Sequence, residues 1–226
     1  MIMDHEIAPG ARVNIDLLSA QLEVSQTPIR EALARLESDG LIAKEPLKGY
    51  KATQLLTIKE LNDLFQFRLL IEPWAAEQAA KLIDNTGKTA LKAEMQSAKT
   101  ALKFAGDSKF QALTEHDSRF HALISNISGN STVADFYERT HCHLHLFRLF
   151  MSNKLHLIDD ESRASYIREL FEQYYQSGSG QLAIKEHDAI AKAILDQKPM
   201  AAKNAMHAHI ESSLKRISQY ASSTRK

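Results

Sequence analysis

The stretch Glu23-Val-Ser-Gln-Thr-Pro-Ile-Arg-Glu-Ala-Leu-Ala-Arg-Leu-Glu-Ser-Asp-Gly-Leu-Ile42 contains the start signal, the apolar stripe and the stop signal of one helix. Ser25 can cap this helix, and Pro28 fits its first turn because the first amides of a helix lack intrahelical acceptors. The helix is therefore expected to begin near Gln26. Its apolar residues recur at helical spacing and predict a buried stripe of Ile29, Leu33 and Leu36.

The segments on both sides complete the pattern of a winged helix-turn-helix. Upstream, Asn14 can cap a short helix that only Glu23 and Val24 separate from Ser25. The apolar residues of that helix are Leu17, Leu18 and Leu22. Downstream, Asp39-Gly40 ends the second helix, and two strands at 41–44 and 50–53 flank a turn. A tight helix pair followed by a hairpin is typical of DNA-binding domains, although some winged helices bind protein instead.

Side chains that face away from the buried stripe can contact base edges or phosphates. The candidates on the second helix and the hairpin are Ser25, Gln26, Thr27, Arg30, Arg35, Lys48 and Gly49. Residues 1–53 hold six Lys and Arg against eight Asp and Glu, which gives a net charge of minus two. The basic footprint that DNA requires must therefore be a focused face, which we expect Arg30, Arg35, Lys48 and Lys51 to form.

This segment resembles the GntR family of bacterial transcription regulators. The resemblance lies in the runs Val24 to Leu33 and Leu36 to Ile42, in Lys48-Gly49, and in Pro9-Gly10, which stands where the family usually has a Pro-Gly pair. It implies a winged helix that binds double-stranded operator DNA. Two subunits of a homodimer would then read a palindrome with half-sites one or more helical turns apart.

Three positions depart from the family pattern. Glu23 stands where the family usually has Gly, and Gln26 stands where it often has Arg. Glutamine can read adenine through two hydrogen bonds, so Gln26 indicates an altered operator preference. The first helix of the family normally begins before Met1, so residues 1–7 are expected to be a shortened start or a stub of that helix.

The composition of the chain restricts its class. Its 226 residues carry 28 basic and 28 acidic side chains, enough length for two domains. No apolar run approaches the roughly 20 residues needed to span a bilayer, and no signal peptide begins the chain, so we expect a cytoplasmic protein with no membrane partner. The one cysteine, Cys142, lies in an apolar helix and is expected to pack rather than react.

After the hairpin the chain is predicted to be entirely helical. Thr57-Ile-Lys-Glu60 has the pattern of a capping box for a helix that continues to about residue 83, so we divide the chain into domains 1–55 and 56–226. Further helices are expected at 88–104, 108–127, 132–151, 162–177, 181–197 and 199–221. The fold is therefore mainly α, with a winged helix followed by a bundle of six or seven helices.

Asp117-Ser-Arg-Phe-His121 places a carboxylate and an imidazole on one helical face. This spacing suits capture of a metal by one helix, and two more histidines from other helices would complete a site. His187 and His209 both lie beside apolar residues on predicted helices. Taken alone, the pair is weak evidence, because Asp and His four residues apart are common solvated neighbours.

The second domain resembles the FCD effector domain of the FadR subgroup of GntR regulators, over nearly all of residues 57–220. The resemblance rests on Arg68-Leu-Leu-Ile-Glu72, Asp117-x-x-Phe-His121, Ser128-Gly-Asn130, Glu186-His187-x-x-Ile190 and His209-Ile210. In many members a divalent metal binds at the positions of Asp117, His121, His187 and His209, and a small carboxylate effector completes its coordination. The resemblance implies that metal here, with zinc favoured over nickel, manganese or iron.

Other polar residues of this domain have less specific interpretations. His141, His145 and Arg148 fall at i, i+4 and i+7 of one predicted helix and could line an effector cavity, with Arg148 gripping a carboxylate. An ordinary polar helix face explains the same spacing. Arg68 and Glu72 are expected to form a structural ion pair, His116 to be a neighbour of the site, and His207 to lie at the surface or pocket rim.

Two functions from different classes follow. The first is a transcription regulator whose operator binding responds to an effector at the metal site, with a metal-independent regulator as a variant. The second is a metal-dependent hydrolase that uses a metal-bound water. Against the hydrolase stands the lack of a clear general base, such as a Glu between paired histidines. Four protein ligands also leave less room for catalysis than three.

Overall fold

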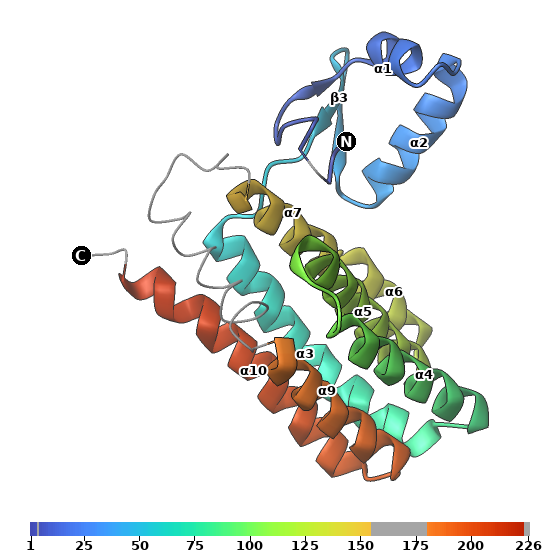
Figure 1. Cartoon of the computed structure of the whole chain (residues 1–226), viewed down its shortest axis with the longest axis vertical. Coiled ribbons are helices and arrows are strands. Elements are labelled where there is room, and N and C mark those ends of the chain that lie inside the picture. The colour runs from blue at the N-terminus through green and yellow to red at the C-terminus, as the bar shows by residue number, and fades with distance from the viewer. Residues whose placement is uncertain (4, 155–179, 224–226) are drawn as a thin grey trace.

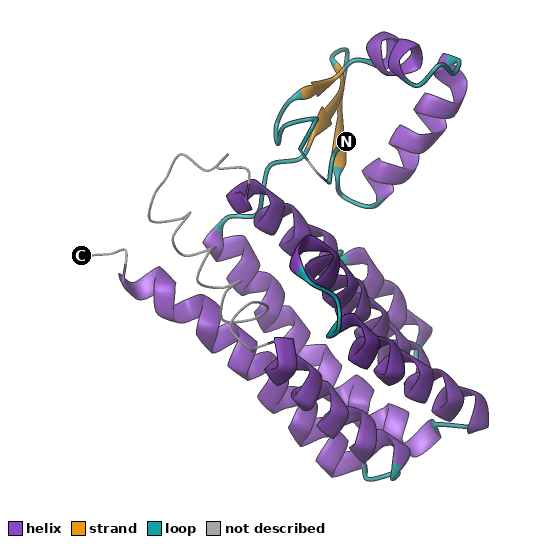
Figure 2. Cartoon of the chain, viewed as in Figure 1, coloured by secondary structure: helices purple, strands orange, loops and turns teal. Residues whose placement is uncertain are grey.

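The computed structural model describes residues 1–3, 5–154 and 180–223. A small three-stranded unit and a helical bundle follow one another along the chain, each with its own buried apolar cluster (Figures 1 and 2). The mainly helical fold predicted from the sequence is confirmed. The helix expected at 162–177 lies outside the described residues.

The N-terminal unit is a winged helix-turn-helix. Its elements are β1 (Arg12–Val13), α1 (Ile15–Gln21), α2 (Gln26–Ser38), β2 (Ile42–Glu45) and β3 (Gly49–Ala52). The strands are antiparallel in the order β1-β3-β2. The helix pair and hairpin agree with the sequence prediction, whereas β1 was not predicted. Two residues are too short for a strand pattern, and β1 exists only because it pairs with β3.

Local signals explain where the two helices begin. The side chain of Asn14 accepts a hydrogen bond from the amide of Leu17 at 3.0 Å, as a helix cap does. Ser25 occupies the cap position of α2, but its side chain makes no capping hydrogen bond. Ile29 and Leu33 are buried beneath α2 and Leu36 is partly buried, so the predicted stripe is confirmed.

Glu23 lies in the turn between α1 and α2 with φ of +54°, in the left-handed region. A side chain there costs about 1–2 kcal/mol that glycine does not pay. We expect Glu23→Gly to raise the free energy of unfolding by about 1 kcal/mol in denaturant titrations. Glu31→Gly, on the exposed face of α2, should lower it by about 1 kcal/mol. A loss of stability in both variants would contradict this explanation of the turn.

The second domain contains α3 (Ile58–Leu82), α4 (Asn85–Ala101), α5 (Gly106–Ile127), α6 (Ser131–Arg139), α7 (Cys142–Lys154), α9 (Gly180–Leu195) and α10 (Pro199–Ser223). The predicted capping box is present, since Thr57 and Glu60 exchange side-chain and backbone hydrogen bonds at the start of α3. The long helices α3 and α10 pack side by side, and α5 and α9 each contact α3 (Figure 1). The metal-binding candidates lie on α5, α9 and α10.

The single helix predicted for 132–151 was wrong. The chain instead forms α6 and α7, separated at Thr140 and His141. His141 has φ of +43°, and no Gly or Pro marks the break in the sequence. The bend gives α7 its own direction, so that it lies at the end of the bundle nearest to the winged helix (Figure 1).

Residues 1–7 were expected to be a shortened start or a stub of a helix. The described part of this segment, which omits Asp4, forms turns and contains no helix. Its apolar residues Ile2 and Ile7 pack onto the core of the winged helix. Within the described parts of the chain, no helix combines the length and the apolar character needed to cross a membrane.

Candidate metal centre and DNA-binding face

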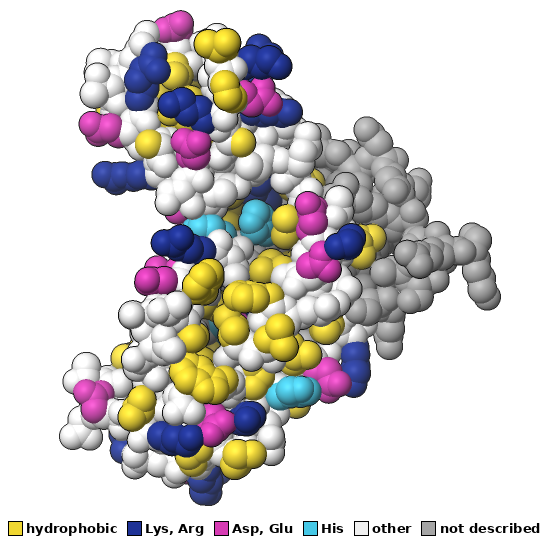
Figure 3. All heavy atoms as spheres, turned by 180° about the vertical axis from the view of Figure 1, so that it is seen from behind, with side chains coloured by type: hydrophobic (Ala, Val, Ile, Leu, Met, Phe, Trp, Pro, Cys, Tyr) yellow, Lys and Arg dark blue, Asp and Glu magenta, His cyan; other side chains and the backbone are white. Residues whose placement is uncertain are grey.

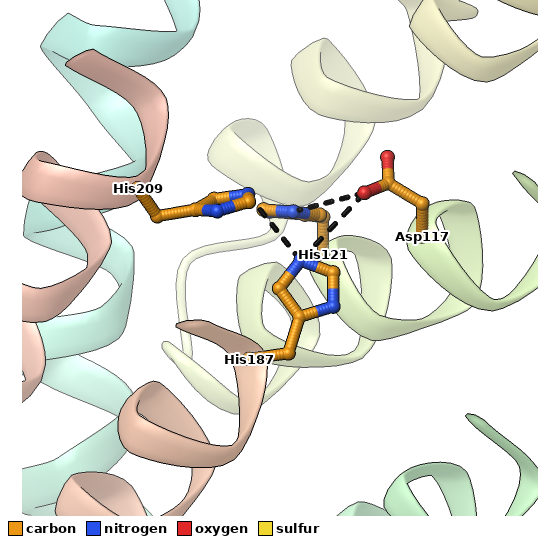
Figure 4. A group of neighbouring side chains, drawn as sticks. All are labelled: Asp117, His121, His187 and His209. Atoms are coloured by element: carbon orange, nitrogen blue, oxygen red, sulfur yellow. Dashed lines mark hydrogen bonds and ion pairs between the residues drawn. The ribbon is translucent and has the colours of Figure 1, made fainter. Parts of the chain in front are cut away.

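Four side chains from three helices converge inside the bundle (Figure 4). Asp117 and His121 come from α5, His187 from α9 and His209 from α10. All four are buried, and one ligand atom from each lies within 4.8 Å of the others. The spacing on α5 brings only the first two together, and the packing of α9 and α10 adds the histidines.

A carboxylate binds the outer nitrogen of two of these histidines. Glu72 Oε2 lies 2.5 Å from His121 Nδ1, and Glu186 Oε2 lies 2.7 Å from His209 Nδ1. Glu72 also accepts a hydrogen bond from Arg68 Nε, so the predicted ion pair is present. The Glu72 carboxylate therefore contacts both Arg68 and His121. An ionised carboxylate only accepts hydrogen bonds, so each Nδ1 carries the proton.

His187 is held through a second histidine. Its Nδ1 lies 2.9 Å from His116 Nε2, and His116 Nδ1 lies 2.7 Å from Glu94 Oε1. Because Glu94 accepts the proton of His116 Nδ1, His116 Nε2 carries a lone pair and accepts the hydrogen bond of His187 Nδ1. His116 is therefore a supporting residue rather than a ligand. The sequence predicted a neighbour but not the contact with α4.

These contacts leave three Nε2 lone pairs facing one another and the Asp117 carboxylate. His187 Nε2 lies 3.3 Å from His209 Nε2. Asp117 Oδ1 lies 3.6 Å from His187 Nε2 and 3.7 Å from His121 Nε2. Among the described residues, His121 Nε2 has no hydrogen-bond partner. Four buried acceptors with no donor between them are unfavourable unless a cation occupies the centre.

Burial favours the neutral, metal-binding form of the His187 and His209 side chains. Burial and the neighbouring histidines lower the pKa of His187 well below its usual value. Burial also lowers the pKa of His209, and Glu186 opposes this only in part. Burial raises the pKa of Glu72, but Arg68 and His121 lower it by more, so that it falls to about 2. Neutral imidazoles and a carboxylate are the forms that bind metal ions.

The spacing of the donor atoms fits a metal ion. Metal bonds of about 2.1 Å in a tetrahedral arrangement separate the donor atoms by about 3.4 Å. Three of the separations, His187 Nε2 to His209 Nε2 and Asp117 Oδ1 to the Nε2 atoms of His121 and His187, lie between 3.3 and 3.7 Å, close to this value. All four donor atoms lie within 4.8 Å of one another, so a tetrahedral ion would draw the more distant pairs closer together, and the donor set of three imidazoles and one carboxylate suits zinc.

A cavity of about 200 Å³ is lined by residues of α5, α6 and the start of α7, and none of the four candidate ligands is among these lining residues. Its lining includes Ser118 and Ala122, each one residue after a candidate ligand, and Tyr137, whose ring centroid lies 6.1 Å from that of His121. The remaining lining residues are Glu138, Thr140, His141, Cys142 and His143. Figure 3 shows histidine side chains at the surface where the two domains meet.

The predicted stripe of His141, His145 and Arg148 is not formed, because His141 precedes α7 and has a left-handed backbone. His141 lines the cavity, whereas His145 and Arg148 are not among its lining residues. Burial and the nearby Arg148 lower the pKa of His145 to about 4, so this imidazole is neutral at pH 7. The guanidinium of Arg148 is directed to Thr53 of the winged domain.

The candidate DNA-binding residues are all exposed on the winged helix. On α2, Arg30 Nη2 donates to Gln26 Oε1 at 3.3 Å, and Gln26 Nε2 donates to Asp16 Oδ1 at 2.5 Å. Gln26 and Arg30 thus lie one turn apart at the start of α2. Lys51, expected in the same basic face, lies 3.8 Å from Glu45.

Comparison with protein families matches both domains. Residues 1–65 match the family described as bacterial regulatory proteins, gntR family, and residues 63–212 match the FCD domain. The chain belongs to the GntR family. Its FCD domain makes it a regulator of the FadR subgroup, as the sequence motifs predicted. GntR regulators bind DNA and form dimers.

Individual relatives agree with this assignment. The GntR chain is 26% identical over 190 residues to the uncharacterized HTH-type transcriptional regulator YdhC of Bacillus subtilis, covering 83% of this chain and 80% of YdhC. It is 38% identical over 81 residues to the Nta operon transcriptional regulator of Aminobacter aminovorans, covering 36% and 38% of the two chains. The structure of E. coli McbR/YncC has the same fold, with a TM-score of 0.67 at 16% identity over 96% of this chain and 92% of that one.

The supporting carboxylates of this GntR chain give a testable result. We expect Glu186→Gln to weaken zinc binding by about 10- to 100-fold. The neutral amide replaces a negatively charged acceptor and so holds the proton on His209 Nδ1 less firmly. Competition with a chromogenic chelator measures the change. Glu115→Gln, an exposed carboxylate on α5, is the matched control and should have no effect. Equal zinc affinities in Glu186→Gln and Glu115→Gln would show that Glu186 does not support His209.

Proposed function

We propose that this GntR regulator binds a divalent metal at Asp117, His121, His187 and His209, and that a small carboxylate effector at this metal changes its affinity for operator DNA. The observation that carries the proposal is the set of Nε2 lone pairs that face Asp117 in a buried centre. Glu72 beside His121 Nδ1, Glu186 beside His209 Nδ1 and the Glu94–His116 pair beside His187 Nδ1 favour the tautomers that leave each Nε2 free for a metal.

Zinc is the metal we propose, with nickel, manganese and iron as the alternatives that the same donors would accept. A bound ion would supply positive charge, and a carboxylate oxygen would bind it as a fifth ligand beside the four protein ligands. The chain supplies orientation, since Glu72 and Glu186 hold the outer nitrogens of two ligands. It also excludes water, because the exposed fraction of each of the four ligands is 7% or less.

The effector site of the proposal is the cavity beside His121. Its volume of about 200 Å³ suits an acid of a few heavy atoms rather than a large metabolite. His141 and His143 are lining residues with hydrogen-bonding groups for the distal part of such an acid. Of the three residues expected to contact an effector, His141 lines this cavity, whereas His145 and Arg148 are not among its lining residues.

On the DNA side, we propose that two copies of the winged helix read a palindromic operator. The N-terminal part of α2 would enter the major groove with Gln26, Thr27 and Arg30, and Ser25 would contact a phosphate. Arg35 and the wing residues Lys48 and Gly49 would contact the flanking backbone. The exposure of all seven residues supports this assignment.

A hydrolase is not favoured by any observation in the described chain. Glu72 and Glu186 are the carboxylates nearest to the cluster, and each binds an Nδ1 on the side away from the centre. A general base would have to face the centre instead. The relatives named above are transcriptional regulators.

A thermal-shift screen tests the proposal. Small sugar acids, hydroxy acids and dicarboxylates are added to the zinc-loaded protein and to protein treated with EDTA. We expect one class of acid to raise the melting temperature of the zinc form only, because binding to the native state stabilises it. Equal shifts with and without EDTA would indicate a metal-independent regulator, and metal-dependent turnover of an ester, amide or phosphate would indicate a hydrolase.

A further inference from the structure

Helix α7 begins beside the metal cluster. Arg68 Nη1 donates to the Sγ of Cys142, the first residue of α7, at 3.4 Å. Burial raises the pKa of Cys142 to about 11, so the sulfur remains a neutral thiol. Arg68 is also the partner of Glu72, which binds His121 Nδ1. The start of α7 is therefore connected to a candidate metal ligand through two buried side chains.

The same helix is hydrogen-bonded to the winged domain through Arg148. Arg148 Nη1 donates to Thr53 Oγ1 at 2.8 Å, and Nη2 donates to the carbonyl oxygen of Thr53 at 2.5 Å. The exposed fraction of Arg148 is only 1%. Two donors in the rigid fork of a guanidinium fix both the distance and the orientation of Thr53 relative to α7.

Thr53 also contacts the residues that follow the recognition helix. Its Oγ1 donates to the carbonyl oxygens of Gly40 and Leu41, at 2.9 and 3.1 Å, and its amide donates to Leu41 O at 3.0 Å. Gly40 and Leu41 follow Asp39, the residue that caps the C-terminal end of α2. A displacement of Thr53 must therefore move the C-terminal end of α2 or break these hydrogen bonds.

Two further contacts strengthen the attachment of α7 to the winged helix. Leu144 packs against the apolar core of the winged domain. His5 Nε2 lies 2.8 Å from the carbonyl oxygen of Arg148 and 2.9 Å from Ser152 Oγ. Within nine residues, α7 thus makes an apolar contact, hydrogen bonds from a guanidinium and a contact with a histidine, all to the N-terminal unit.

We propose that Arg148 and Thr53 are positioning residues that transmit the state of the metal cluster to the recognition helix. The path runs from His121 through Glu72 and Arg68 to α7, and from Arg148 to Thr53. Without a cation, repulsion among the inward acceptors displaces His121 and its partners, and α7 moves with them. This inference rests on the proposed metal site. Buried side chains join His121 to the start of α7, and the part-buried contact of Arg148 with Thr53 completes a continuous path, whose coupling the following measurement tests.

The test compares operator affinity of the full chain with and without zinc. The probe is a duplex that the zinc-loaded wild-type protein selects from a random pool, and binding is measured by fluorescence anisotropy in Zn²⁺ or in EDTA. We expect the two Kd values of the wild type to differ by at least tenfold, within the usual range of allosteric coupling. Thr53→Val and Arg148→Lys should reduce this ratio to within about twofold of one.

Matched variants separate coupling from folding. Thr53→Ser retains the hydroxyl and should retain the wild-type ratio, as should Arg139→Lys on the exposed surface of α6. Zinc content should remain near one per chain in every variant. A tenfold ratio that survives in Thr53→Val and Arg148→Lys would overturn the relay, as would a ratio of one in a wild type that binds zinc. Absence of zinc from the wild type would instead overturn the proposed metal site and remove the input of the relay.

Discussion

His187→Ala is expected to lose nearly all bound metal. The substitution removes one of four ligands, and it also leaves the His116–Glu94 pair without the group that it orients. Loss of a ligand and its support should lower zinc affinity by well over 100-fold, since changing a supporting partner alone costs about 10- to 100-fold. Elemental analysis of purified protein should find about one zinc per chain in the wild type and little in the variant.

His207→Ala is the matched control for this measurement. His207 lies on α10 two residues before His209, but its side chain is exposed and points to a different face of the helix. The control should bind as much zinc as the wild type. Equal zinc in His187→Ala and the wild type would show that metal bound to this protein lies elsewhere.

Arg30→Ala is expected to weaken operator binding by more than tenfold. Arg30 is exposed near the start of α2, one turn after Gln26, where side chains of a recognition helix reach base edges. A good contact of arginine with a base is worth about 1–3 kcal/mol, and a homodimer loses two copies. Titration of a selected duplex at fixed salt concentration measures the change.

Arg139→Ala, an exposed arginine on α6, should leave operator affinity unchanged. Both variants lose one positive charge per chain, so the comparison separates a specific contact from the general attraction of charge to DNA. Unchanged affinity in Arg30→Ala would contradict the assignment of α2 as the recognition helix. A loss of similar size in both variants would indicate only a charge effect.

Local signals predicted the winged helix well. The start of α2 at Gln26 follows from Ser25 and Pro28, and the hairpin follows from Gly40 and Gly49, whose φ values of +68° and +83° suit glycine. The departure at Glu23 has a structural meaning, since this residue adopts the left-handed conformation that the usual glycine allows. The short β1 was missed because pairing with β3, not its own sequence, makes it a strand.

The candidate metal centre was predicted from motifs, but its supporting contacts were not. Glu94 reaches His116 from another helix, 22 residues away in sequence, and no local spacing indicates such a contact. The break at His141 was missed for a related reason, because tertiary packing holds a non-glycine residue in a left-handed conformation. That break determines the direction of α7, and with it the role of Arg148.

Anomalous diffraction at the zinc absorption edge, from crystals of the zinc-loaded wild-type protein, locates the metal directly. We expect one strong peak per chain in the buried centre, about 2.0–2.2 Å from Asp117 Oδ1 and from the Nε2 atoms of His121, His187 and His209. An empty centre in crystals that contain zinc elsewhere, or histidines turned with Nδ1 toward the ion, would contradict this expectation.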